Sequence, residues 1–325
     1  MIRRRAVLAG AAALLPAGRA AAVRVTPTVR HATVLVGAPE GSGLDAHARP
    51  FVPFLSRFMP GLEFTVHNLP GDGGMNAIRA LMAAPSANLT LGWVVSPTMP
   101  ARAIDRQDDT HLHRLQLLGA VEREPVAFVS PAGAPLDSLQ DMIQRASADQ
   151  DAIPLGTPPP GSAPHLAVLR LQLLAQTRLN IVTFPSAAAA MQAVLGANVS
   201  AAALGLSDVI GALRNEKLVG LGIAARNRFG ILPDMPVLQE AGVPLSATIR
   251  RGLAVPVGGS EEMVGRLIAA CRGIAADPDF QELANQRGYR AQWMDGQAWA
   301  GLMERERVDL AKLWTTDPWL PSSGG

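Results

Sequence analysis

From Ala32 onward, short apolar runs alternate with helix-length segments whose apolar residues recur every three or four positions. This alternation is typical of strands that feed crossover helices in a mostly parallel sheet, so it predicts an α/β fold. The predicted strands are 33–36, 63–66, 89–95, 125–130, 152–155, 180–184, 200–206, 219–224 and 252–255. The predicted helices are 76–84, 138–148, 165–176, 188–195, 207–215, 261–276, 279–287 and 297–313.

Two prolines interrupt the helical pattern that follows Asp45. A proline past the first turn of a helix costs about 3 kcal/mol, because it removes a backbone hydrogen bond and clashes with the preceding turn. We therefore expect either a kink at Pro50 and Pro53 or a helix that starts near Pro50 after an extended loop.

The length of the chain, 325 residues, exceeds that of a typical single domain and indicates two lobes. Its 48% hydrophobic and 17% charged residues are those of a globular protein. Residues 1–22 combine Arg3, Arg4 and Arg5 with a short apolar run and an Ala-rich end, which predicts a secretory signal. Export by the Sec route and export by the twin-arginine route both fit this segment, and its apolar run is too short to span a bilayer.

Removal of the signal changes the charge of the chain. The segment contains four arginines, Arg3, Arg4, Arg5 and Arg19, and no acidic residue. Subtraction of these four from 29 basic residues leaves 25 against 27 acidic ones in residues 23–325, so the pI of about 9.2 does not describe the mature protein. We therefore expect no nucleic acid partner. The single cysteine, Cys271, lies on a predicted helix face, where it can form neither an intrachain disulfide nor an N-terminal lipid anchor. A periplasmic location without a lipid anchor is favoured.

Three glycine-rich segments lie where a predicted strand passes into a predicted helix: residues 37–45, 68–74 and 156–165. Loops of this kind bring backbone N–H groups and helix N-termini to anions. The first and third loops therefore predict a carboxylate site between the two lobes. The alternative for the first loop is a tight turn, with Asp45 as helix cap paired to Arg49.

Enzymatic motifs are weak in this sequence. It contains no His-x-x-x-His, no cysteine pair and no Gly-x-Ser-x-Gly. The close pair His111 and His113 has no acid cluster beside it, and a solvated loop is the simpler interpretation. We expect no catalytic residue, no metal and no cofactor.

The loops resemble a known family. Gly41-x-Gly43-x-Asp45-x-x-Ala48-Arg49, Asn68-x-Pro70-Gly71-x-Gly73-Gly74 and Gly161-Ser162-x-x-His165-Leu166-Ala167 are similar to the signature loops of the Bug-type solute receptors of tripartite tricarboxylate transporters. Residues 232–236, 240–244 and 255–260 are similar as well, and the motifs occur in the order that the family has.

The resemblance implies a type II periplasmic binding protein fold, with two mixed-sheet α/β lobes, two crossovers and a ligand cleft. The expected division is a signal over 1–22, one lobe from 23–124 plus 250–325, and a second lobe from 125–249. The implied ligand is a small organic anion, a carboxylate or a related metabolite. The implied ligand-binding residues are Glu40, Gly41, Ser42, Gly43, Leu44, Asp45, Ser96, Thr157, Gly161, Ser162, Ala163, His165, Ser186, Ala187, Ser207 and Asp208.

The sequence also departs from the family's pattern. Glu40 and Leu44 stand where the first loop commonly has other residues, residues 185–188 lack a common Tyr and Lys, and residues 205–206 lack a common Phe-Asp. A less acidic, more apolar or amide-bearing ligand is therefore an alternative.

The favoured function is that of an exported, monomeric solute-binding protein that delivers its ligand to the membrane subunits of a tripartite tricarboxylate-type transporter. Two alternatives stay open at the level of sequence. One is a ligand-sensing receptor for a membrane signalling kinase, which would share every feature above. The other is an exported hydrolase, for which the sequence offers no convincing set of residues.

Overall fold

The computed structural model describes residues 30–85 and 88–320, so the predicted signal over 1–22 lies outside the described residues. The strands are β1 (Arg30–Val36), β2 (Leu62–Asn68), β3 (Leu89–Ser96), β4 (Leu115–Pro131), β5 (Pro154–Thr157), β6 (Asn180–Thr183), β7 (Ala201–Gly205), β8 (Leu218–Ile223), β9 (Thr248–Pro256) and β10 (Arg290–Asp295). Their order is β2-β1-β3-β9-β4-β7-β5-β6, and β8 and β10 both pair with β4. Each predicted strand is present, although β4 and β9 begin before their predicted starts, and β10 was not predicted.

The helices are α1 (Gly43–Phe58), α2 (Met75–Met82), α3 (Thr98–Asp105), α4 (Thr110–Arg114), α5 (Leu139–Ala148), α6 (Ala163–Ala175), α7 (Ala187–Leu195), α8 (Leu206–Arg214), α9 (Glu261–Ala276), α10 (Pro278–Gln286) and α11 (Gly296–Thr316). Short 3₁₀ turns cover Asp72–Gly74, Gln150–Ala152 and Leu238–Ala241. Every helix predicted from the sequence is present, and α9 has the predicted bounds. Helices α3 and α4 were not predicted.

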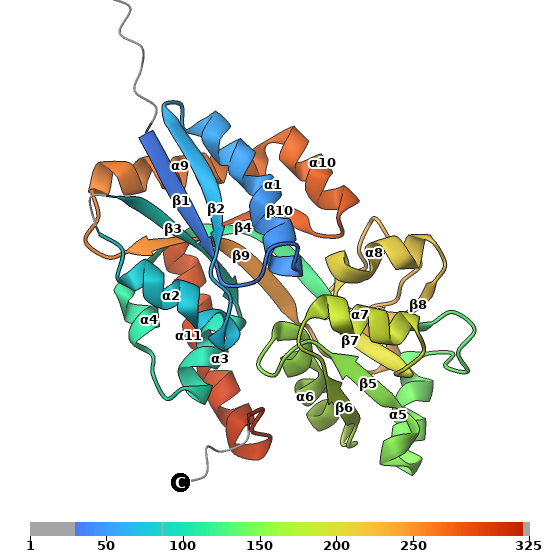
Figure 1. Cartoon of the computed structure of the whole chain (residues 1–325). Helices are drawn as coiled ribbons and strands as arrows, with labels where there is room; N and C mark the ends of the chain where they lie inside the picture. Colours follow the sequence, from blue (N-terminus) through green and yellow to red (C-terminus); the bar gives the residue numbers. More distant parts are fainter. Residues whose placement is uncertain (1–29, 86–87, 321–325) are drawn as a thin grey trace, which may run out of the picture.

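Two lobes arise because β4 and β9 run from one part of the molecule into the other (Figure 1). We call the part around β1, β2, β3 and β10 lobe A, and the part around β5, β6, β7 and β8 lobe B. Residues 115–125 of β4 pair with β9 in lobe A, whereas residues 126–131 pair with β7 and β8 in lobe B. The architecture is the mixed α/β fold with two crossing strands that the resemblance implies. The mostly parallel sheet predicted from the hydrophobic pattern is wrong, because β4 pairs antiparallel with β7, β8, β9 and β10.

The first half of β4 corrects a prediction, because the sequence placed the start of this strand at Pro125. Residues 122–124 are all charged, whereas the residues of a buried strand are usually apolar. Glu122 and Glu124 are nevertheless fully buried, since Arg251 of β9 and His47 of α1 lie against them.

Helix α1 contains both prolines and begins at Gly43, so the expectation of a start near Pro50 is wrong. The Oγ of Ser42 caps the helix by accepting a hydrogen bond from the Asp45 N–H at 3.4 Å. Pro50 has no N–H to donate to the carbonyl of Ala46, and Arg287 donates to that carbonyl instead at 2.9 Å. An external donor thus offsets the hydrogen bond that the proline removes.

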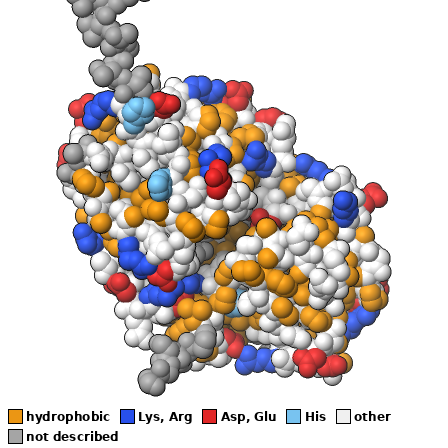
Figure 2. Space-filling view, viewed as in Figure 1, with side chains coloured by type: hydrophobic (Ala, Val, Ile, Leu, Met, Phe, Trp, Pro, Cys, Tyr) orange, Lys and Arg blue, Asp and Glu red, His pale blue; other side chains and the backbone are white. Residues whose placement is uncertain are grey.

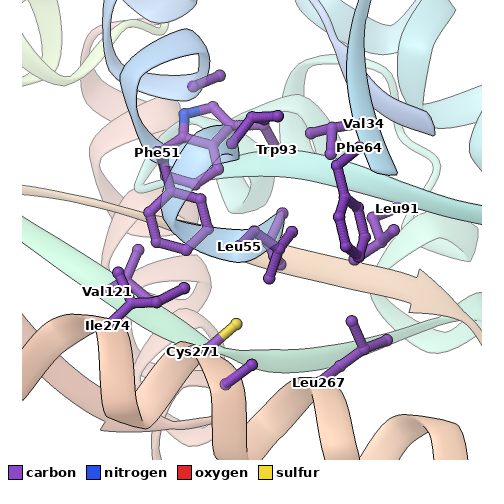
Figure 3. Close-up of a cluster of buried hydrophobic side chains, with 14 of the residues drawn as sticks. Val34, Phe51, Leu55, Phe64, Leu91, Trp93, Val121, Leu267, Cys271 and Ile274 are labelled. Atoms are coloured by element: carbon purple, nitrogen blue, oxygen red, sulfur yellow. The ribbon is translucent and has the colours of Figure 1, made fainter. Parts of the chain in front are cut away.

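The core of lobe A lies on both faces of its sheet. On one face α1, α9 and α10 enclose large side chains that include Phe51, Leu55, Trp93 and Cys271 (Figure 3). Burial of each of the larger ones stabilises the fold by about 1.5–3 kcal/mol. Cys271 is inaccessible and burial raises its pKa to about 12, which confirms the buried helix face predicted for it. On the other face, α2, α3 and α11 pack around Trp299.

Lobe B has two apolar clusters, one with α5 and α6 and one with α7 and α8. A smaller cluster joins the lobes, because Leu166 and Leu169 of α6 pack against Leu310 and Leu313 of α11 and against Ala101 of α3. Helices α3 and α11 therefore connect lobe A to the start of α6, which the sequence predicts to be part of a binding site.

Candidate functional site

The loop between β1 and α1 forms one rim of the groove that separates the lobes (Figure 2). Gly41 has φ of +75°, and its N–H donates to Asp45 Oδ2 at 3.0 Å. Asp45 is almost fully buried and also accepts hydrogen bonds from Arg49 and Asn68. Burial opposes ionisation of Asp45, but the hydrogen bonds from Arg49, Asn68 and Gly41 prevail and lower its pKa. The carboxylate therefore holds the loop together.

The turn interpretation of this loop is confirmed in part. Asp45 pairs with Arg49 at 2.8 Å, but the capping side chain is that of Ser42. Glu40 is exposed at the mouth, with Oε1 3.3 Å from Arg49 Nη2. Gly43 begins the helix, and a Cβ added there would lie 2.9 Å from Asp208 Oδ1 of lobe B. The first rim thus meets α8 across the groove.

The guanidinium of Arg102, on α3, lies between two glycine-rich loops. A Cβ on Gly73 would come within 2.9 Å of its Nη1, and a Cβ on Gly161 within 1.6 Å of its Nη2. Arg102 Nη2 donates to the Pro160 carbonyl at 2.7 Å and lies 2.9 Å from Asp105 Oδ2. Burial lowers the pKa of Arg102. Glycine is needed at both loop positions because any larger residue would displace this cation.

Polar atoms without partners gather at the start of α6. Ser162 Oγ, His165 Nδ1 and Arg102 Nε are buried and have no hydrogen-bond partner among residues 30–85 and 88–320. Burial, and then the positive charge of Arg102, lowers the pKa of His165 to about 4, so His165 is neutral at pH 7. Buried polar atoms are normally hydrogen-bonded, so an unpartnered set marks a place where a ligand or water belongs. Thr157, by contrast, is satisfied, because its Oγ1 donates to the Pro158 carbonyl at 3.0 Å.

A small cavity connects Arg102 with the first rim. It holds about 70 Å³ and is lined by residues that include Gly37, Leu44, Gly74, Thr98 and Arg102. At about 10–15 Å³ for each water-sized group, this is room for a carboxylate and a few further atoms. The walls are apolar apart from the arginine and the hydroxyl of Thr98.

A buried charge cluster lies at the base of the groove, where α1, β4, β9 and α8 meet. His47 Nδ1 is 2.7 Å from Glu122 Oε2, and its Nε2 is 3.0 Å from Ser207 Oγ. Glu124 accepts a hydrogen bond from the Ser207 N–H at 2.6 Å and lies 2.5 Å from Arg251 Nη1. The cluster therefore ties helix α1 of lobe A to the start of α8 in lobe B.

The ionisation of this cluster follows from burial. Burial lowers the pKa of His47 to about 3 and raises that of Glu122 well above its usual range. His47 is then neutral at pH 7 and carries a single ring N–H, while burial disfavours the charged form of Glu122. Burial, and then the nearby Glu124, raises the pKa of Asp208 to about 7. Arg251 and Glu124 remain as the charged pair.

Three of the sequence-predicted site residues take local structural roles. The Oγ of Ser96 accepts a hydrogen bond from Trp299 Nε1 at 3.0 Å, so this side chain faces α11. Ser186 caps α7, which begins at Ala187, through a hydrogen bond from Ala189 N–H at 3.0 Å. Ala163 begins α6 and packs into the core of lobe B.

Sequence reasoning missed Arg102, His47, Glu122, Glu124 and Arg251. One signal was available: a charged run at 122–124 and a second at 250–251, each next to a predicted strand. Charges at the ends of two crossing strands can meet in the middle of the molecule. No comparable signal pointed to Arg102, because its role depends on the approach of α3 to two loops.

The two histidines of the close pair differ, since His113 is exposed and His111 is buried. His111 is buried in α4, and its Nε2 lies 3.0 Å from the Met99 carbonyl, so the solvated-loop interpretation is wrong for this residue. Within the part of the chain that the structure describes, no group of three His, Cys, Asp or Glu side chains is placed to hold a metal ion. In that same part, no helix has the length and apolarity to cross a membrane.

Comparison with known proteins identifies the family. Residues 61–312 match the family described as tripartite tricarboxylate transporter family receptor. A UPF0065 protein of Bordetella bronchiseptica is 26% identical over 290 residues, which cover 87% of this chain and 84% of that protein.

Two solved structures show the same fold. Rpa4515 of R. palustris, a structure with adipate, has a TM-score of 0.80 at 20% identity and is matched over 88% of this chain and 97% of its own. MatC of Rhodopseudomonas palustris, with bound malate, has a TM-score of 0.76 at 23% identity, over 88% of this chain and 99% of its own. Because the family match covers well over half of its length, the chain belongs to the TctC family, the solute-binding receptors of tripartite tricarboxylate transporters.

Proposed function

We propose that this protein is an exported, non-enzymatic receptor that binds a small carboxylate in the groove and delivers it to the membrane subunits of a tripartite tricarboxylate transporter. In this proposal it acts as a monomer and needs no metal or cofactor. In this proposal one lobe comprises residues 23–124 and 250–325, and the other comprises residues 125–249.

The observation that carries the proposal is the set of unpartnered atoms around the start of α6. Ser162 Oγ and Arg102 Nε lie beside the N-terminus of a helix, where backbone N–H groups are also free to donate. A carboxylate there would receive charge-assisted hydrogen bonds worth about 1.5–3 kcal/mol each. Two or three such bonds contribute about 3–9 kcal/mol, and micromolar binding needs about 8 kcal/mol net, so burial of the apolar part of the ligand would have to supply the remainder and the ordering costs.

The ligand class follows from the lining of the small cavity. One carboxylate would lie near Arg102, and the body of the ligand would pass Leu44 and the glycines of the first two loops. The related structures with malate and adipate support a carboxylate. The apolar wall favours a ligand with a hydrocarbon body over a densely charged one.

A binding screen with an arginine variant tests this proposal. Calorimetry with malate, succinate and adipate should find a ligand for the wild type, and R102Q should weaken it at least tenfold, since one charge-assisted bond is worth about 1.4 kcal/mol or more. R106Q is the matched control, because Arg106 follows α3 directly but is paired with Asp72. Equal affinity of the wild type and R102Q would contradict the proposed site.

A pair of glycine variants provides a second test that does not remove a charge. Gly161 and Gly133 have φ of +75° and +77°, so an alanine at either position pays a similar backbone penalty of about 1–2 kcal/mol. Only at Gly161 would the new Cβ displace Arg102, since nothing lies within 4 Å of the Cβ position of Gly133. G161A should lose carboxylate binding while G133A keeps it. Loss of binding in both variants would mean that the effect is one of stability.

A further inference from the structure

A second cavity lies between α6 of lobe B and α11 of lobe A, over the crossing strands β4 and β9. Its volume is about 610 Å³, within the range of about 300–1,000 Å³ that is usual for small-molecule sites. It shares no lining residue with the small cavity beside Arg102. Five arginines line it: Arg123, Arg170, Arg226, Arg250 and Arg305.

The floor of this cavity places like charges in register. Arg123 of β4 is directly opposite Arg250 of β9 on one side and Arg290 of β10 on the other. Like charges at opposed positions of antiparallel strands destabilise the pairing. Arg123 and Arg250 are also half-buried, and burial followed by the neighbouring arginines lowers the pKa of Arg123. The fold therefore brings these positive charges together although their repulsion lowers its stability.

The described part of the chain neutralises these charges only in part. Within residues 30–85 and 88–320, none of the five arginines has a carboxylate oxygen within 4 Å. Glu306 and Asp309 are the acids in the lining. Even with both ionised, five positive charges face two negative ones. Burial raises the pKa of Glu306 to about 7, so this residue supplies less than a full charge at neutral pH.

We propose that this arginine-lined cavity is a second anion site, which binds a small multivalent oxyanion carrying phosphate or carboxylate groups. The planar guanidinium groups of Arg123 and Arg250 would bind oxygen atoms in pairs, and the excess of positive charge requires more than one negative charge on the ligand. Arg170 on one wall and Arg305 on the other would reach it from opposite lobes.

Binding of an anion at this site would favour one arrangement of the two lobes. The walls come from α6 and residues 226–248 on one side and from α11 on the other. An anion that contacts both walls favours the arrangement in which they are this close, by its difference in affinity between arrangements. The site would therefore couple a second solute to the movement of the lobes around the groove.

Calorimetry at constant ionic strength tests the proposal with two probes, pyrophosphate and citrate. The wild type should bind at least one of them at a single site with a Kd of about 100 µM or below. The double variant R123Q/R250Q should bind it at least tenfold more weakly. R266Q, which removes an exposed arginine from α9, should bind as the wild type does. Preference for pyrophosphate would assign the ligand to phosphate compounds, and preference for citrate to polycarboxylates.

Two outcomes would overturn the proposal: failure of both probes to bind the wild type, or equal weakening in R123Q/R250Q and R266Q. If R123Q/R250Q does not fold, R170Q/R305Q replaces it, because these two residues lie on helices at the walls. R102Q separates this site from the groove, since it should leave binding of the probe unchanged while it weakens binding of the carboxylate at least tenfold. The experiments can therefore contradict either proposed site without contradicting the other.

Discussion

Strands β4 and β9 carry charged residues on both faces, and the two faces compensate these charges differently. Toward α1 and α8, Arg251 Nη1 lies 2.5 Å from Glu124 Oε2, and His47 Nδ1 lies 2.7 Å from Glu122 Oε2. Toward α11, Arg123 and Arg250 lie opposite each other, and no carboxylate oxygen of the described residues is within 4 Å of either.

The difference shows how alternation along a strand gives one short segment two roles. Successive side chains of a strand point to opposite faces, so Glu122 and Glu124 face one way and Arg123 the other. The compensated face needs no outside partner and connects the two lobes. On the uncompensated face, Glu306 and Asp309 offset only part of the charge of five arginines, which is why we assign a ligand to it.

The largest expected effect is a difference in the free energy of unfolding between two variants, each of which loses one arginine from one face. R251M leaves Glu124 buried without its cation, and breaking a buried ion pair in this way costs about 3–5 kcal/mol. R250M removes a charge that repels Arg123, so it should change the free energy of unfolding by less than about 1 kcal/mol or increase it. Urea unfolding of both variants measures the difference. A similar decrease in the free energy of unfolding of both variants would show that the charges on the two faces are equally well paired.

The order of the elements and the position of the loops could be predicted because apolar runs and glycine turns are local signals. The first half of β4 could not, since its buried carboxylates are satisfied by residues from α1, β9 and α8 that lie far away in the sequence. Arg102 could not be predicted as a site residue either, because its contacts also come from residues that lie far away in the sequence. Ser96 was expected at a ligand, but its hydroxyl pairs with Trp299, which only the packing of α11 reveals.

A smaller effect is expected from Asp208, on the compensated face. Its pKa is raised from 3.8 to about 7, first by burial and then by Glu124. Below pH 4 the folded and unfolded states are both protonated; between pH 4 and pH 7 only the unfolded state ionises, so the fold loses stability as the pH rises. D208N should therefore be more stable than the wild type by about 1–3 kcal/mol at pH 7 and no more stable at pH 4.

Urea unfolding at the two pH values measures this change. D234N is the control for the substitution itself, because Asp234 is exposed and lies outside the buried cluster. A stabilisation by D208N that is the same at both pH values would mean that Asp208 is ionised in the folded protein.

The smallest expected effect concerns Glu306, on the arginine face. Arg250 of β9, Arg170 of α6, Ser96 of β3 and Arg305 of its own helix surround it, yet burial prevails and raises its pKa to about 7. An anion in the arginine-lined cavity would raise that pKa further, so Glu306 should take up a fraction of a proton when pyrophosphate binds at pH 7.

Calorimetry at pH 7 in buffers of different ionisation enthalpy measures this uptake, and the same titration of E306Q subtracts the proton uptake of pyrophosphate itself. Because protonation removes a negative charge from the cavity, wild-type affinity should strengthen as the pH falls from 8 to 6, after correction for the probe. E306Q should bind a few-fold more tightly than the wild type at pH 8, and the two should converge at pH 6. If uptake and affinity are the same in both proteins at every pH, Glu306 does not face the bound anion, and the ligand lies closer to the Arg226 side of the cavity.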